Sequence, residues 1–176
     1  MTTNASRVLV ASASKHGATA QIAERIGQKL RDHGCDVTVA DAGRVDTVDG
    51  YDAVVMGSAV YAGHWLDDAK SLADRVASQR PRPAVWLFSS GPVGDPPKPE
   101  EDPVDVAAIA EATSPNDHQV FAGKIDKAKL GFAERAIMIA VRAPEGDFRD
   151  WAAIDSWAGE IADALRPAQN RATPGS

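Results

Sequence analysis

The stretch RVLVASASKHGATAQIAERIGQKLRDHG, residues 7–34, decides the fold class of this chain. Residues 7–12 have a continuous apolar centre and the length of a short buried strand. Apolar residues then recur at helical spacing from Ile22 to Leu30, and Gly34 stands where a left-handed residue ends a helix. Because a strand followed directly by an amphipathic helix begins a βαβ unit, this stretch predicts an α/β fold.

The same alternation of short apolar runs and amphipathic segments continues along the chain. Further strands are predicted at residues 36–41, 52–58, 83–89 and 118–123, and further helices at residues 65–78, 104–112, 129–141 and 150–165. Parallel strands joined by right-handed crossovers form a doubly wound sheet, and we expect five strands in the order 2-1-3-4-5. We expect a single domain over residues 1–166 and a disordered C-terminal tail over the polar residues 167–176.

The composition is that of an ordinary globular chain and argues against several partners. Of the 176 residues, 44% are hydrophobic and 25% are charged, with a net charge of −6. Nucleic acid is not an expected partner, because phosphate backbones are bound by clusters of Lys and Arg. Charges or glycines interrupt every apolar run before about 20 residues, so we expect no transmembrane segment. The small, polar residues 1–6 do not resemble a targeting signal, and the single cysteine, Cys35, excludes an internal disulfide, so we expect a cytoplasmic location.

The loop after the first strand has the chemistry of a phosphate site. Ligands of such sheets bind outside the carboxyl ends of the strands, at the switch point between strands 1 and 3. Hydroxyls, a glycine and the free amides at a helix start can all bond a phosphate. The candidate residues of this first loop are Ser14, Lys15, His16, Gly17, Ala18 and Thr19. The competing interpretation is that Ser14 only caps the helix.

The sequence lacks the motifs of other well-known nucleotide-binding loops. No G-x-x-x-x-G-K-[ST] motif occurs, and no G-x-G-x-x-G follows the first strand. The first strand ends in Ser12 and Ala13 rather than in an acidic pair that could hold magnesium. These exclusions leave the phosphate of a mononucleotide as the expected ligand group.

Two further loops combine small residues with aromatic or hydroxyl side chains. The second loop supplies the candidates Ser58, Ala59, Val60, Tyr61, Ala62 and Gly63. The third supplies Ser90, Gly91, Pro92, Val93 and Gly94. We expect Tyr61 to stack on a planar ring, while Trp65 fits equally well a second stacking residue or a packing anchor for the next helix. Three such loops on adjacent strands predict one ligand with a phosphate end and a planar end.

These segments resemble the flavodoxin-domain family. Residues 14–19 are similar to its phosphate loop, [ST]-x-T-G-x-T, with His16 where the family commonly has a hydroxyl. Residues 13–17, 57–64 and 146–151 resemble the branch that includes the menaquinone-dependent protoporphyrinogen oxidases. The resemblance implies a flavodoxin-like fold and non-covalent FMN, with its phosphate on the first loop and its isoalloxazine between the other two. It also implies an oxidase acting on a porphyrinogen and passing electrons to a quinone, although residues 124–149 are shorter and more balanced in charge than the insertion of those oxidases.

Three functions remain open at this point. The chain could be an FMN-dependent oxidoreductase, a flavodoxin-type electron carrier that docks to redox partner proteins, or an interaction module that has lost FMN. A substrate enzyme needs a pocket over the ring, whereas a carrier needs only an exposed flavin edge. No catalytic acid or base stands out, and His16, His64 and His118 are candidates by residue type alone.

Overall fold

A computed structural model describes residues 5–14, 17–61, 64–90, 105–121, 124–125, 146–147 and 149–165. Its main sheet consists, in spatial order, of the parallel strands β2 (Asp36–Asp41), β1 (Arg7–Ala13), β3 (Ala53–Tyr61), β5 (Ala84–Ser90) and β6 (Asp117–Phe121). The short β4 (His64–Trp65) pairs antiparallel with the end of β3. With β4 set aside, this is the order 2-1-3-4-5, so the predicted fold class is confirmed. A separate antiparallel pair is formed by β7 (Lys124–Ile125) and β8 (Gly146–Asp147).

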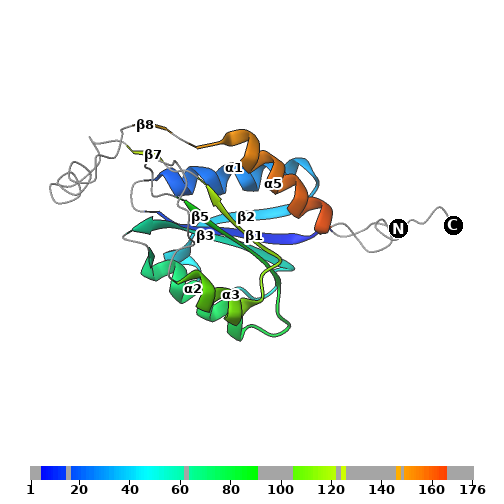
Figure 1. The fold of residues 1–176 in the computed structure, drawn as a ribbon. Coiled ribbons are helices and arrows are strands. Elements are labelled where there is room, and N and C mark those ends of the chain that lie inside the picture. The colour runs from blue at the N-terminus through cyan, green and yellow to red at the C-terminus, as the bar shows by residue number, and fades with distance from the viewer. Residues whose placement is uncertain are drawn as a thin grey trace.

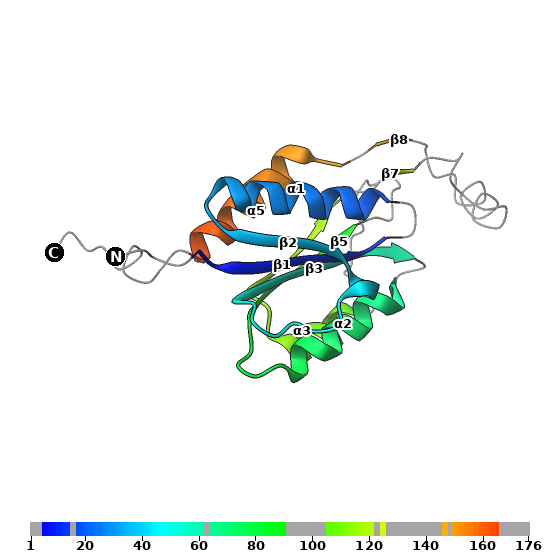
Figure 2. The ribbon, with the colours of Figure 1, turned by 180° about the vertical axis from the view of Figure 1, so that it is seen from behind.

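Helices cover both faces of the main sheet (Figures 1 and 2). On one side lie α1 (Ala18–Asp32) and α5 (Trp151–Ala164), and on the other lie α2 (Asp67–Ser78) and α3 (Val106–Thr113). A short 3₁₀ helix, η1 (Ala42–Arg44), follows β2. Because helices cover both faces of the sheet, successive residues of a strand are buried on opposite faces. This explains why the strands are continuously apolar.

Two cores result, one on each face of the sheet. Val8 and Val10 pack with α1 and α5, whereas Leu9 and Ala11 pack with α2 and α3. On the first side, an aromatic cluster forms with ring centroids 5.7–6.4 Å apart in tilted or edge-to-face geometry; its members are Phe88, Phe121 and Trp157.

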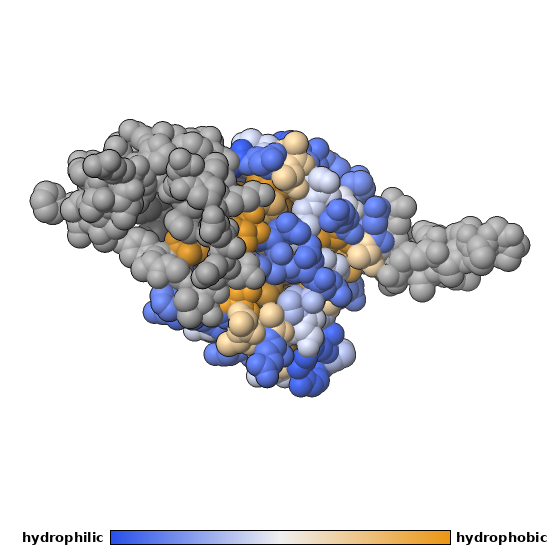
Figure 3. All heavy atoms as spheres, in the orientation of Figure 1, coloured by the Kyte–Doolittle hydropathy of each residue, from blue (hydrophilic) through white to orange (hydrophobic). Residues whose placement is uncertain are grey.

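The helices present their polar faces outward, and Figure 3 shows the hydrophobic surface of this view mostly beside the atoms drawn in grey. Among the described helices, none has both the length and the hydropathy to cross a membrane.

Contacts between α1 and α5 fix their relative position. The Arg25 guanidinium donates two hydrogen bonds to the Asp155 carboxylate, at 2.6 and 2.7 Å, and holds the pKa of that carboxyl below its ordinary value.

The ends of these two helices are set by local residues. Asp150 caps α5 by accepting a hydrogen bond from the amide of Ala153 at 3.0 Å. At the end of α1, Gly34 has a φ of 91°, so the predicted left-handed helix end is confirmed.

The predicted boundary at the end of the third strand is wrong. The sequence interpretation ended that strand at residue 58 and began a helix at residue 65, but β3 continues to Tyr61 and turns back into β4. Val60 pairs with Trp65, and Tyr61 with His64, so the end of β3 and the short β4 form an antiparallel β-hairpin. The helix predicted at residues 129–141 and the tail at residues 167–176 lie outside the described residues.

Candidate functional site

The ends of β1, β3 and β5 lie side by side at one edge of the sheet. Ala13 pairs with Ser58, and Ser58 pairs with Ser89, so the three strands reach the edge in register. Figure 1 shows this carboxyl edge on the left, together with the beginning of α1. The first, second and third loops therefore leave the sheet from neighbouring strands, at the switch point expected for such a fold.

The described part of the first loop leads directly into α1. Ser14 is half-buried, and its Oγ accepts a hydrogen bond from the amide of Gly17 at 2.9 Å. Gly17 has a left-handed φ of 90°, and a Cβ added there would meet no atom of the described residues within 4 Å. Its backbone conformation, rather than crowding, therefore favours glycine, and the space above it is open. Ala18 and the buried Thr19 begin α1, while Lys15 and His16 lie outside the described residues.

The beginning of α1 is electrostatically suited to an anion. Its first amides have no partner within the helix, and the helix dipole places partial positive charge there. No acidic residue stands in the first turn of α1, whereas Asp67 and Asp68 stand in the first turn of α2. The positive end of α1 is thus not offset by a carboxylate from its own first turn, and it can attract a phosphate.

In the second loop, the buried Ser58 uses its hydroxyl to stabilise the hairpin. Its Oγ donates to the carbonyl of Ala59 at 2.8 Å and accepts from the amide of Leu66 at 2.9 Å. Ala59 and Val60 are half-buried in β3, and Tyr61 is the last residue of that strand. Ala62 and Gly63 lie outside the described residues.

Trp65 is a packing anchor, which resolves one of the alternatives left open by the sequence. The residue is 2% exposed, and its indole Nε1 donates a hydrogen bond to Ser89 Oγ at 2.8 Å. Ser89 Oγ also lies 2.9 Å from His118 Nε2. These hydrogen bonds join β4, β5 and β6 just before the carboxyl end of β5.

The third loop begins at Ser90, which ends β5 and is buried. Gly91, Pro92, Val93 and Gly94 lie outside the described residues. The first residue described after this gap is Asp105, which sequence reasoning missed as a site residue. Its Oδ2 accepts a hydrogen bond from the amide of Trp65 at 3.0 Å and lies 3.2 Å from His64 Nδ1. The sequence placed Asp105 inside the helix predicted at residues 104–112, and nothing in that local pattern marks this contact.

Metal and thiol chemistry find no support in the part of the chain that the structure describes. It contains no group of three or more His, Cys, Asp or Glu residues able to hold a metal ion. Cys35 lies at the other end of α1, just before β2, and burial raises the pKa of its thiol. A raised pKa disfavours the reactive thiolate.

Comparisons with known proteins agree with this arrangement. The sequence matches the family described as Flavodoxin domain over residues 9–151, and no curated protein matches it. Among solved structures, the flavodoxin of Streptococcus pneumoniae TIGR4 is 18% identical, with 91% of this chain and 100% of that chain covered and a TM-score of 0.63. A flavodoxin from the domain Archaea is 17% identical, with 92% and 99% covered and a TM-score of 0.61.

A longer protein shares the same fold. The rubredoxin oxygen:oxidoreductase of Desulfovibrio gigas is 17% identical, with 91% of this chain covered and a TM-score of 0.61. This chain spans only 36% of the length of that protein. At such identities the structural likeness shows the fold, whereas the family match extends from β1 to the first residue of α5. The chain belongs to the flavodoxin-domain family.

Proposed function

We propose that this protein binds FMN at the carboxyl edge of its sheet and uses it to transfer electrons. The observation that carries the proposal is the alignment of the ends of β1, β3 and β5 beside the start of α1, in a member of the flavodoxin-domain family. The donor set fits the cofactor, because helix-start amides, a serine hydroxyl and an open glycine suit a phosphate monoester. When bound, FMN supplies the redox chemistry, and the protein supplies position and electrostatics.

In this proposal each loop has a separate task. Residues 14–19 hold the phosphate, with amides of α1 and the hydroxyls of Ser14 and Thr19 as donors. Residues 58–63 and 90–94 hold the isoalloxazine, and the hairpin formed by β3 and β4 carries Tyr61 to the ring. The hydrogen bond between Trp65 and Ser89 supports this hairpin, because it ties β4 to β5.

The narrower function keeps two candidates from the sequence. The resemblance of residues 13–17, 57–64 and 146–151 supports a protoporphyrinogen oxidase that passes electrons to a quinone. The match to whole flavodoxins, one of them covered over 100% of its length, supports an electron carrier that docks to a redox partner protein. Mixing the FMN-loaded protein with a porphyrinogen and a quinone distinguishes them, since catalytic turnover of the pair is expected only from the oxidase.

The phosphate assignment predicts a loss of FMN affinity in the double variant Ser14→Ala, Thr19→Ala. The dissociation constant for FMN should rise by an amount that corresponds to about 1–3 kcal/mol for each hydrogen bond to the charged phosphate that is lost. Riboflavin has no phosphate, so its affinity should be the same for the variant and the wild type. Titrations followed by flavin fluorescence measure both constants. Equal FMN affinities for the two proteins would place the phosphate elsewhere.

The ring assignment predicts that Tyr61 quenches the fluorescence of bound FMN. In Tyr61→Ala, part of the fluorescence should return, and binding should weaken by about 0.5–1.5 kcal/mol beyond the loss of buried area, because a stacking partner is removed. Tyr61→Phe is the matched control, since it keeps the ring and should keep the quenching. Complete quenching in Tyr61→Ala would contradict the assignment.

A further inference from the structure

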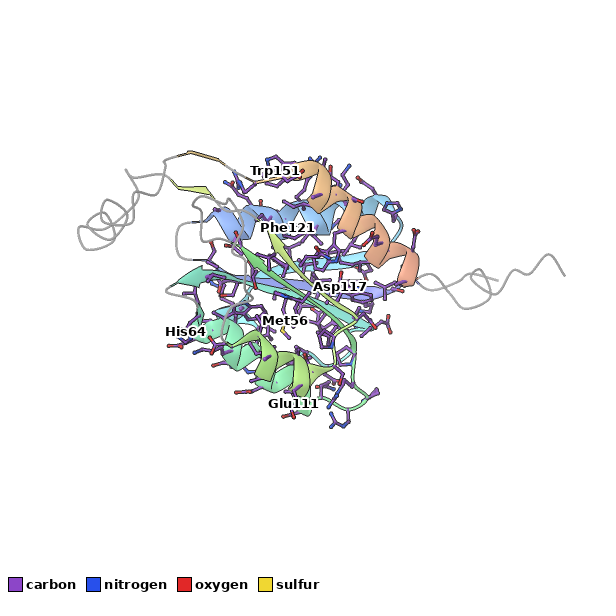
Figure 4. The ribbon with its side chains drawn as sticks, viewed as in Figure 1. Met56, His64, Glu111, Asp117, Phe121 and Trp151 are labelled. Carbon is purple, nitrogen blue, oxygen red and sulfur yellow. The ribbon has the colours of Figure 1, made fainter. Side chains whose placement is uncertain are left out.

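The carboxylate of Asp105 reaches across from the start of α3 to the hairpin of the second loop. Its Oδ2 accepts the Trp65 amide at 3.0 Å and lies 3.2 Å from His64 Nδ1, and Lys70 Nζ is 4.0 Å away. Trp65 and His64 precede Asp105 by 40 and 41 positions, so this is a tertiary contact. Figure 4 shows His64 at the carboxyl edge, beside the start of α2.

Asp105 makes this contact in place of its local one. It occupies the N-cap position of α3, where an aspartate ordinarily accepts an amide of its own helix. The side chain of Asp105 makes no such cap bond, and its carboxylate is directed to β4 instead. Because this carboxylate accepts a hydrogen bond from a distant strand and not from its own helix, its position points to a structural role at the hairpin.

The hairpin transmits this restraint to the residue proposed to stack on the ring. His64 pairs with Tyr61, and Trp65 with Val60, so a contact that fixes β4 also fixes the end of β3. Ser58 accepts a hydrogen bond from the Leu66 amide, and Ser89 accepts one from the Trp65 indole. Both serines, however, belong to strands of the main sheet. Of these three supports, only Asp105 carries a charge and only Asp105 follows the segment of the third loop.

From this geometry we infer that Asp105 is a positioning residue of the ring site, which ties the start of α3 to β4 and so fixes the end of β3, where Tyr61 lies. The inference rests on the proposed function, since the ring site is the one assigned to FMN above. Asp105 need not contact the cofactor, because it acts through the backbone of Trp65 and through His64. Its loss should therefore weaken every ligand that shares the isoalloxazine, with or without a phosphate.

The test compares Asp105→Ala, Asp105→Asn and the control Asp67→Asn with the wild type. Asparagine keeps an oxygen that can accept the Trp65 amide, so it should rescue most of the function lost in the alanine variant. Asp67 is a matched control, because it also pairs with Lys70, at 3.3 Å, but its side chain is 97% exposed, against 22% for Asp105. Each protein is measured for hydrogen exchange at the Trp65 amide without flavin, and for its affinities for FMN and riboflavin.

In Asp105→Ala we expect the Trp65 amide to exchange roughly tenfold faster or more, because a hydrogen bond to a charged acceptor is lost. The dissociation constants for FMN and riboflavin should both rise, by the same factor of about ten, and the fluorescence of bound flavin should partly return. Asp105→Asn should stay within about threefold of the wild type, and Asp67→Asn should match it. Asparagine is as good an N-cap as aspartate, so its rescue does not separate the two roles, but a loosened α3 alone would leave flavin quenching and the exchange of the Trp65 amide unaltered.

Two results would overturn the inference: an unchanged Trp65 exchange rate in Asp105→Ala, or wild-type flavin affinities in that variant. A loss of FMN affinity without a loss of riboflavin affinity would also overturn it, because the effect would then lie at the phosphate. A wild-type protein that binds neither flavin would overturn the proposed function, and with it the assignment of Asp105 to a ring site. The exchange rates of the flavin-free protein would then still show whether Asp105 holds the hairpin.

Discussion

Replacing Trp65 by alanine is expected to lower the free energy of unfolding by about 3–5 kcal/mol, as is typical of a large aromatic residue lost from a core. Trp65 is 2% exposed and is among the largest fully buried side chains of the protein. It packs with the core on the α2 and α3 side, and its indole donates to the buried Ser89 Oγ. Because β4 is only two residues long, the hairpin should also open, and FMN binding should be lost. Urea unfolding followed by circular dichroism measures the first effect and flavin titration the second.

The milder variant Trp65→Phe separates packing from hydrogen bonding. It keeps an aromatic ring in the core but removes the Nε1 donor, so a loss of about 1–3 kcal/mol is expected. A double-mutant cycle with Ser89→Ala isolates the pair, and the two changes together should cost less than their sum. Trp151→Ala is the control, because Trp151 is half-buried and stacks on the Arg149 guanidinium, a contact of about 0.5–1 kcal/mol. An equal loss of stability in Trp151→Ala and Trp65→Ala would contradict the assignment of Trp65 as an anchor.

Removal of the Phe88 ring is expected to destabilise the protein by a similar amount, about 3–5 kcal/mol in Phe88→Ala. Phe88 is fully buried, and its ring lies in the aromatic cluster with Phe121 and Trp157. On its other side the ring fills the space above Gly57, its neighbour across the strands, where an added Cβ would overlap the ring atoms. Gly57→Ala alone should therefore cost about 1–3 kcal/mol through overpacking.

The two changes should be strongly non-additive. In the Phe88→Ala background the new methyl group of Gly57→Ala enters the cavity, so its cost should vanish or become a gain. Free energies of unfolding for the wild type, both single variants and the double variant provide the cycle. If Gly57→Ala costs the same in both backgrounds, the glycine is required for its backbone and not for the room that Phe88 occupies.

The fold class and the edge at which a ligand is expected could both be predicted from the sequence. Both follow from local physics, because burial sets the periodicity of residues 7–13 and 18–32, and Gly34 sets the left-handed end of α1. The strand order 2-1-3-4-5 also followed, since right-handed crossovers leave few alternatives for such an alternation. The three loops then had to share one edge, because parallel strands end on the same side of a sheet.

The contacts that hold that edge together could not be predicted from the sequence. Sequence reasoning placed a loop after residue 58, because the apolar run did not show that β3 continues to Tyr61 and pairs with β4. Trp65 fitted two roles equally until its indole was found buried against Ser89. Asp105 fell inside a helix predicted at residues 104–112, and its bond to the Trp65 amide joins residues 40 positions apart. Periodicity and capping patterns describe neighbours along the chain, whereas these contacts exist only once the sheet has brought distant strands together.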